Sequence, residues 1–99
     1  MLKTVYHPAA EAELIKAARV YNKKVPGLGE DLLDEIDRAV AVIQEDPTRW
    51  RCVDEDFRRY LVKRFPDALI YRFGETTIRI LAVKHHKRHP DYWKRRKSS

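Results

Sequence analysis

Two segments with a helical spacing of apolar residues fill the first half of the chain, and neither is apolar all round. Pro8 suits the first helical position of the first segment, and the Pro26-Gly27-Leu28-Gly29 break ends it. The second segment runs over about residues 29–45 and ends before Asp46-Pro47, because the residue that precedes a proline avoids the helical region. Two such helices joined by a short link are typical of an antiparallel hairpin. Each helix must therefore cover another layer of the protein with its apolar face.

Alternating segments rich in aromatic and β-branched residues predict that this other layer is a sheet. They lie at residues 2–6, 57–65, 68–73 and 77–84, and Gly74-Glu75 predicts a tight hairpin between the last two. The predicted fold class is α+β: an N-terminal strand, a two-helix antiparallel hairpin, and then three antiparallel strands in one small curved sheet. Pro90 is expected to start a short C-terminal helical turn, and residues 1–99 are expected to form a single domain.

The net charge of +6 is distributed unevenly along the 99 residues. Residues 1–56 hold 8 Lys and Arg against 12 Asp and Glu, whereas residues 84–97 hold 7 against 1. A cationic second half beside a mildly acidic first half predicts a polyanionic partner or an acidic protein partner. A solvated lysine-rich tail is the alternative, but aromatic residues and histidines are mixed into this charge.

No apolar run approaches the roughly 18 residues that a transmembrane helix needs, so no contact with a membrane is expected. Met1-Leu2-Lys3 leads straight into an alternating segment, which predicts that there is no signal peptide. Cys52 is the only cysteine and cannot form an internal disulfide, which fits a reducing compartment. The expected location is therefore the cytoplasm.

The predicted strand at residues 57–65 carries four basic side chains. Alternation sends Arg59 and Lys63 to one face of the sheet, and Arg58 and Arg64 to the other. One pair should line the face opposite the helices, where the histidine-rich tail can fold over the rim. Cations bind phosphates, and aromatic side chains stack on unpaired bases. The sequence therefore predicts a surface for single-stranded nucleic acid, with further contacts in the tail from Lys87, Trp93, Arg95 and Arg96.

The tail also holds groups suited to proton transfer. Cleavage of RNA would need a base for the 2′-hydroxyl, cations for the crowded phosphate and an acid for the leaving oxygen. The available proton carriers are His85, His86, His89 and Tyr92. Histidine titrates near neutral pH, whereas tyrosine needs cationic neighbours that lower its pKa, and the tail supplies them. Two structural alternatives stay open: Tyr92 packs the tail on the sheet, and His85 orients the tail through a backbone hydrogen bond.

Neither a metal ion nor an organic cofactor is expected. The tail histidines sit among cations with Asp91 as the only nearby carboxylate, and this field repels a divalent ion. The sequence also lacks a dinucleotide-binding glycine fingerprint, a phosphate-binding P-loop and a serine nucleophile motif.

Short motifs follow one another in order along nearly the whole chain. They are YHPAAEAEL at residues 6–14, Asp46-Pro47, RRYLVKRFP at 58–66, LIYR at 69–72, ILAVKH at 80–85 and RHPDYW at 88–93. In this order and spacing they resemble the RelE/ParE superfamily of type II toxin–antitoxin toxins, close to chains called plasmid stabilisation proteins. The resemblance implies a small cytoplasmic bacterial toxin with two helices packed on an antiparallel sheet. It also implies a cognate antitoxin, encoded in the same operon, that neutralises the toxin in a hetero-oligomeric complex.

The superfamily has two branches with different targets. RelE-like members cut mRNA in the ribosomal A site without a metal, and ParE-like members inhibit DNA gyrase and are not nucleases. Resemblance to the first branch places catalytic groups at Arg59, at His86 or Arg88, and at Tyr92, and His85 is a further candidate. An arginine of that branch falls near Ala68, which cannot replace it. We predict ribosome-dependent mRNA cleavage, with gyrase inhibition as the alternative and an inactive binding partner or DNA co-repressor as a third hypothesis.

Overall fold

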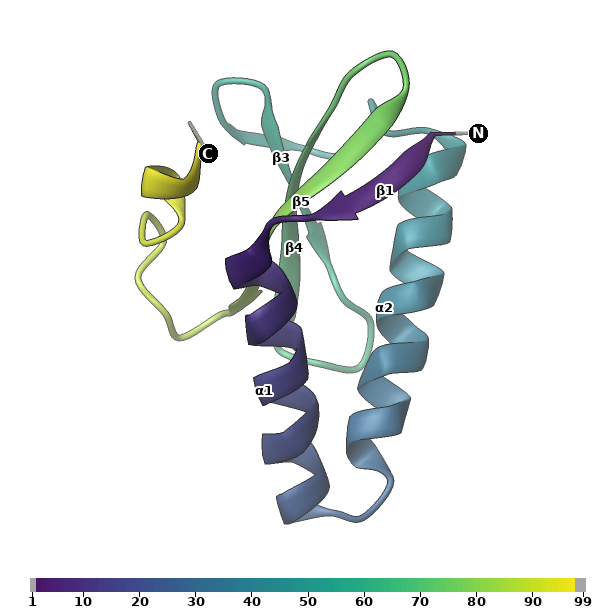
Figure 1. Ribbon diagram of the computed structural model, residues 1–99, viewed down its shortest axis with the longest axis vertical. Coiled ribbons are helices and arrows are strands. Elements are labelled where there is room, and N and C mark those ends of the chain that lie inside the picture. Colours follow the sequence, from purple (N-terminus) through teal and green to yellow (C-terminus); the bar gives the residue numbers. More distant parts are fainter. Residues whose placement is uncertain (1, 98–99) are drawn as a thin grey trace.

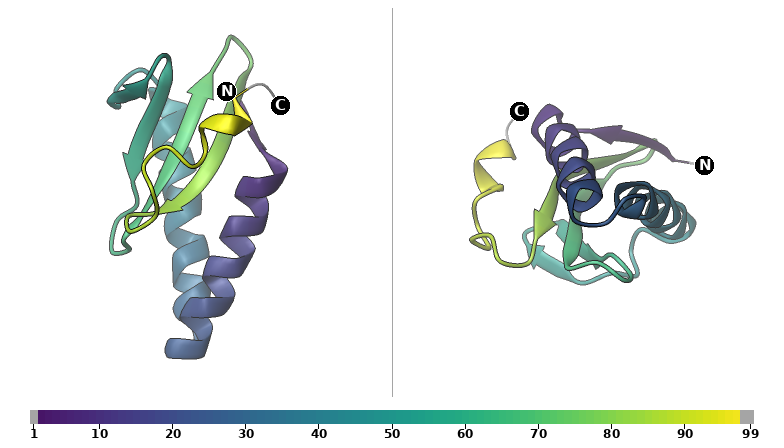
Figure 2. Two further views of the ribbon diagram at one scale, coloured as in Figure 1. Left: turned by 90° about the vertical axis from the view of Figure 1, so that its left-hand side faces the viewer. Right: turned by 90° about the horizontal axis from the view of Figure 1, so that it is seen from below.

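A five-stranded sheet forms the middle layer of the fold, with two helices on one face and the C-terminal segment on the other (Figures 1 and 2). The computed structural model describes residues 2–97. Its helices are α1 (Pro8–Lys24) and α2 (Leu28–Glu45), and a 3-10 turn, η1, spans Lys94–Arg96. Its strands are β1 (Lys3–Tyr6), β2 (Cys52–Asp54), β3 (Phe57–Leu61), β4 (Asp67–Phe73) and β5 (Thr77–His85). The predicted α+β class, the helical hairpin and the C-terminal helical turn are confirmed.

The strand order in the sheet is β1-β5-β4-β3-β2. β1 pairs in parallel with β5, and the other neighbouring strands are antiparallel. β2 was not predicted, because three residues with exposed or half-buried side chains carry no apolar alternation. The strand predicted over residues 57–65 ends earlier, at Leu61, and the chain then turns through Arg64, which has a φ of 70°. The helical turn expected from Pro90 becomes regular only at Lys94.

Local signals fix both ends of α1. Pro8 occupies its first turn, and the His7 ring caps the helix, since Nδ1 accepts a hydrogen bond from the Ala9 amide at 3.0 Å. Gly27, with a φ of 89°, turns the chain into α2 through the left-handed region that favours glycine. α1 and α2 then pass close together at Gly29, whose amide donates to the Asn22 side chain at 2.7 Å.

The two faces of the sheet bury two separate apolar clusters. The larger cluster lies under the helices and includes Leu32 and Ile36 of α2 against Leu69 and Ile80 of the sheet. The smaller cluster lies under the C-terminal segment, where Trp93 contacts a set from three strands: Phe57, Ile70, Leu81 and Ala82. The left-hand view of Figure 2 shows this segment in front of the sheet and α2 behind it.

A bulge in β5 divides that strand between the two clusters. Ile70 of β4 pairs with Ala82, but its neighbour Tyr71 pairs with Ile80, so Leu81 is an extra residue in the ladder. Leu81 and Ala82 therefore both belong to the smaller cluster, although they are adjacent in the chain. Simple alternation predicts Ile80 and Ala82 on one face of the sheet, whereas the bulge places them on opposite faces.

We expect Gly29→Ala to destabilise the protein although alanine is the better helix former. An added Cβ would collide with the carbonyl oxygen of Ala18 and lie 2.8 Å from side-chain atoms of Asn22. Overpacking of this kind costs about 1–3 kcal/mol of unfolding free energy, which exceeds the roughly 1 kcal/mol that helix propensity returns. The midpoint of urea unfolding measures the loss. Gly74→Ala is the matched control, because a Cβ there meets no atom within 4 Å; equal midpoints for the two variants would contradict the clash.

Candidate functional site

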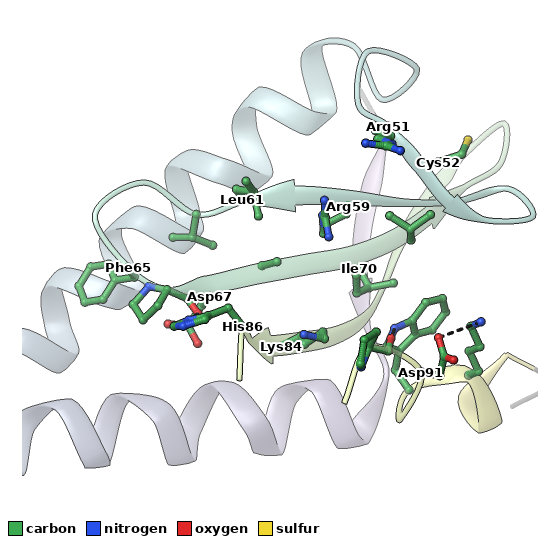
Figure 3. Close-up of a pocket in the computed structure, with 17 residues that line it drawn as sticks. Arg51, Cys52, Arg59, Leu61, Phe65, Asp67, Ile70, Lys84, His86 and Asp91 are labelled. Atoms are coloured by element: carbon green, nitrogen blue, oxygen red, sulfur yellow. Dashed lines mark hydrogen bonds and ion pairs between the residues drawn. The ribbon is translucent and has the colours of Figure 1, made fainter. Parts of the chain in front are cut away.

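An open groove of about 730 Å³ lies on the sheet face opposite the helices (Figure 3). β2 and β3 form one wall, and the C-terminal segment forms the other through Trp93 and its neighbours. Leu61, Ala68 and Ile70 contribute apolar surface. The basic side chains that line the groove are Arg51, Arg59, Lys84, His86 and Lys94. The groove is thus an apolar hollow with a cationic lining.

The electrostatic field in the groove is positive. Burial and the charges of Arg59 and Arg88 lower the pKa of Lys84. The two carboxylates that line the groove have partners other than Arg59 and Lys84: Asp67 accepts from the Tyr21 hydroxyl at 2.7 Å, and Asp91 pairs with Lys94 at 2.9 Å. Repulsion between Lys84 and Arg59 is therefore not relieved by either carboxylate, and this part of the groove would attract an anion.

Residues 86–97, which we call the C-terminal strap, cross the open face and are tied to α1 by one half-buried acid. The Glu13 carboxylate, with a side chain only 13% exposed, accepts from the Tyr92 hydroxyl at 2.6 Å and from Arg88 Nη1 at 3.1 Å. Arg96 donates to both carboxylate oxygens, at 2.8 and 3.1 Å. The Val83 amide of β5 adds a fifth hydrogen bond at 3.1 Å. Glu13 thus joins α1, β5 and the strap.

This network reverses the expected behaviour of Tyr92. Burial, and then the hydrogen bond to Glu13 and its charge, raise the pKa of the Tyr92 phenol above its ordinary value. Arg88 and Arg96 act in the opposite direction but do not prevail. The prediction that cationic neighbours lower the Tyr92 pKa is therefore wrong, because a carboxylate distant in sequence lies against the hydroxyl. The phenol stays protonated at neutral pH and faces Glu13.

Trp93 belongs to the core of the molecule. Its side chain is 2% exposed, its ring lies 5.5 Å from that of Phe57, and its Nε1 donates to the Pro90 carbonyl at 2.7 Å. The indole is therefore not placed to stack on a base, contrary to the sequence-based expectation. The far end of the strap is tied to the sheet as well, since Lys97 pairs with Asp54 and Glu55.

The basic residues around β3 do not share one surface. Arg58 donates to the Trp50 carbonyl at 2.6 Å and the Thr48 carbonyl at 2.9 Å. Arg64 lies 3.6 Å from Glu35 of α2, and Lys63 lines a separate hollow beside α2. Alternation was expected to place Lys63 on the face of Arg59, but the strand ends at Leu61 and the pattern stops there.

The rings of the tail histidines interact with the nearby backbone and with each other. His85 accepts from the Lys87 amide at 3.1 Å, and His89 accepts from the Asp91 amide at 3.1 Å, in both cases through Nδ1. This arrangement agrees with the structural alternative for His85. The His86 ring stacks on His85 with centroids 4.7 Å apart and also lines the groove.

The structure therefore separates the predicted site residues into two groups. Arg59 and His86 both line the groove, whereas Arg88, Tyr92 and Arg96 gather around Glu13. Lys87 and Arg95 are exposed on the strap. Sequence reasoning missed two residues of this region, Lys84 and Glu13. Glu13 carried a signal, because it lies in the stripe that α1 presents to the core, three residues after buried Ala10.

Two general features bear on the chemistry of the described part of the chain. Within residues 2–97, no cluster of three or more His, Cys, Asp or Glu side chains is arranged to hold a metal ion. Neither helix of that range combines the length and the apolar character needed to cross a membrane.

We expect the stability of the protein to fall above pH 10, partly through Tyr92. The folded state favours the protonated phenol, whose ordinary pKa is 10.0, so its contribution is complete below pH 10 and is lost as the pH rises towards the raised value. Urea unfolding between pH 8 and 11 should therefore show a shallower decline for Tyr92→Phe than for the wild type. Parallel declines would contradict the proposed environment of the phenol.

Comparison with known proteins identifies the family. A model of the ParE toxin of the type II toxin–antitoxin system parDE matches residues 4–90. No curated protein matches the chain. Among solved structures, a chain of the chromosomal ParDE TA system from P. aeruginosa has a similar fold, with a TM-score of 0.74, at 18% identity over 86% of this chain and 96% of that one. The family match spans most of the chain and confirms the RelE/ParE resemblance: the protein belongs to the ParE toxins of type II toxin–antitoxin systems.

Proposed function

We propose that this toxin arrests growth by binding and inhibiting DNA gyrase, without cleaving RNA. The observation that carries the proposal is the Glu13 network. Tyr92, Arg88 and Arg96 are the tail groups expected to act on a phosphate, and they surround a carboxylate instead of the groove. A protonated phenol held by a carboxylate is a poor general base, and a paired guanidinium has lost part of its attraction for a phosphate.

Inhibition by binding makes smaller demands on the site. It needs a rigid surface of suitable charge, and no group that titrates near neutral pH. The strap offers such a surface, because Lys87 and Arg95 are exposed and the Arg88 side chain is 52% exposed. Ala68 also lines the groove at the position where the nuclease branch is expected to carry an arginine.

The groove favours mRNA cleavage as a second candidate function. Arg59, Lys84 and His86 all line it, which combines an anion-attracting surface with an imidazole, the side chain that most often transfers protons in enzymes. In this alternative His86 would transfer the proton, Arg59 and Lys84 would bind the phosphate, and Tyr92 would only hold the strap in place.

A type II system provides an antitoxin as the partner of this chain. We propose that the antitoxin forms a cytoplasmic hetero-oligomer with the toxin and covers surfaces of two kinds. An acidic segment suits the cationic groove, and apolar side chains suit the exposed hydrophobic residues of the helical hairpin. These residues are Ile15, Val20 and Leu33, with Val25 at the end of α1.

Expression of the toxin without its antitoxin should stop DNA synthesis before protein synthesis. Pulse labelling of both after induction measures the order, and a supercoiling assay with purified gyrase tests the target directly. We expect the purified toxin to inhibit supercoiling. Loss of translation first, with mRNA cut on ribosomes and supercoiling unaffected, would contradict the proposal and favour the nuclease.

The variant Arg59→Ala distinguishes gyrase inhibition from mRNA cleavage. Removal of a cation that stabilises the reacting phosphate lowers a cleavage rate by about 10²–10³-fold, so a nuclease would lose its toxicity. Under gyrase inhibition we expect Arg59→Ala to arrest growth as the wild type does. The matched control is Arg19→Ala, which removes an exposed cation from α1. A survival increase limited to Arg59→Ala would overturn the binding mechanism.

A further inference from the structure

The C-terminal strap has two anchors of different kinds. Its second half is held by buried Trp93 and by the ion pairs of Lys97 with Asp54 and Glu55. Its first half lacks such packing: the residues from His86 to Asp91 are exposed. The bonds that tie this first half to α1 converge on Glu13, from Arg88 and Tyr92. The His86 amide donates to the Pro66 carbonyl at 2.9 Å, and beyond this bond the position of the first half against α1 depends on one carboxylate.

The charge balance at Glu13 makes it difficult to replace. A single negative charge faces two guanidiniums, since Arg88 lies 3.1 Å and Arg96 2.8 Å from its oxygens. Both guanidiniums also lie against the Tyr92 ring, at 3.7 and 5.0 Å from its centroid. Without the carboxylate the two cations would repel each other, and the Tyr92 hydroxyl would lose its acceptor.

The residues around Glu13 also form part of the outer surface. A hollow of about 530 Å³ is lined by His7, Ala9, Arg88, Tyr92, Arg95 and Arg96. Arg95 and Arg88 are exposed at this hollow, so the conformation that Glu13 imposes decides where their charges point. A surface of this kind is complementary to an acidic patch on a protein.

We propose that Glu13 is a positioning residue of this toxin: it fixes the first half of the strap in the conformation that binds an acidic surface of gyrase. This inference rests on the proposed function. Glu13 is not itself in contact with the target, and acts through Arg88, Tyr92 and Arg96.

Glu13→Gln tests the inference, because glutamine keeps the side-chain length, removes the charge and turns an amide group towards the arginines. Glu11→Gln is the matched control, as Glu11 is an exposed acid on the same helix. Hydrogen exchange should become about tenfold faster or more in residues 86–92 of Glu13→Gln only. The toxin concentration for half-inhibition of supercoiling should rise by about tenfold, and Glu13→Asp, which keeps the charge, should recover part of the loss.

Gly29→Ala distinguishes positioning from a general loss of stability, because it strains the helical hairpin far from the strap in sequence. At equal folded fractions, we expect Gly29→Ala to inhibit gyrase normally. Unchanged exchange in Glu13→Gln would overturn the anchoring role. Faster exchange with unchanged gyrase inhibition would overturn positioning and leave the proposed function intact. A wild type that does not inhibit gyrase would overturn both the proposed function and the gyrase part of this inference, whereas the exchange data would still decide the anchoring.

If Glu13→Gln does not fold, Tyr92→Phe takes its place. It removes one hydroxyl and leaves both arginines paired with the carboxylate. Exchange in residues 86–92 should then rise measurably but by less than about tenfold, with a matching rise in the toxin concentration for half-inhibition of supercoiling. No change in either measurement would overturn the proposal.

Discussion

Burial of β4 on both of its faces is the constraint from which the architecture follows. Every residue from Asp67 to Tyr71 is buried, so neither face of this strand can be left to solvent. The helical hairpin covers one face through the larger apolar cluster, and Trp93 covers part of the other. A segment with only a single 3-10 turn has no core of its own, and it depends on this contact and on Glu13 for its position.

The partial cover over β4 explains why the molecule has a groove. Trp93 fills the position above Ile70 and Leu81, while Arg59 and Lys84 remain beyond it on neighbouring strands of the same face. The acids of α2 cannot neutralise these cations, because they lie behind the sheet, where Glu35 pairs with Arg38 and Arg64. The same packing thus leaves positive charge at the groove, whereas at Glu13 one carboxylate offsets part of the charge of two arginines.

The helices and the main strands were predictable because their apolar residues repeat with the period of each element. β2 and the bulge were not, since three residues show no period and Leu81 has the same apolar character as its neighbours. At the site, alternation correctly separated Arg59 from Arg58 but failed for Lys63, which lies beyond the end of the strand. The environment of Tyr92 could not be predicted from its neighbours in sequence. Its nearest charges in sequence are mainly cations, whereas Glu13 is 79 residues away.

The bulge in β5 has a consequence for how this sheet tolerates changes of length. Because Leu81 is supernumerary in the ladder, the residues before it and after it are out of phase with each other. Deletion of that one residue would make the pairing regular and would leave the residues after it on their present faces, because Ile80 and Ala82 already lie on opposite faces of the sheet. If instead all nine residues of β5 alternated regularly, Lys84 would point towards the helices and Val83 towards the groove. The surplus residue is thus a phase shift, which sets the face of the sheet that Val83 and Lys84 occupy in a strand of this length.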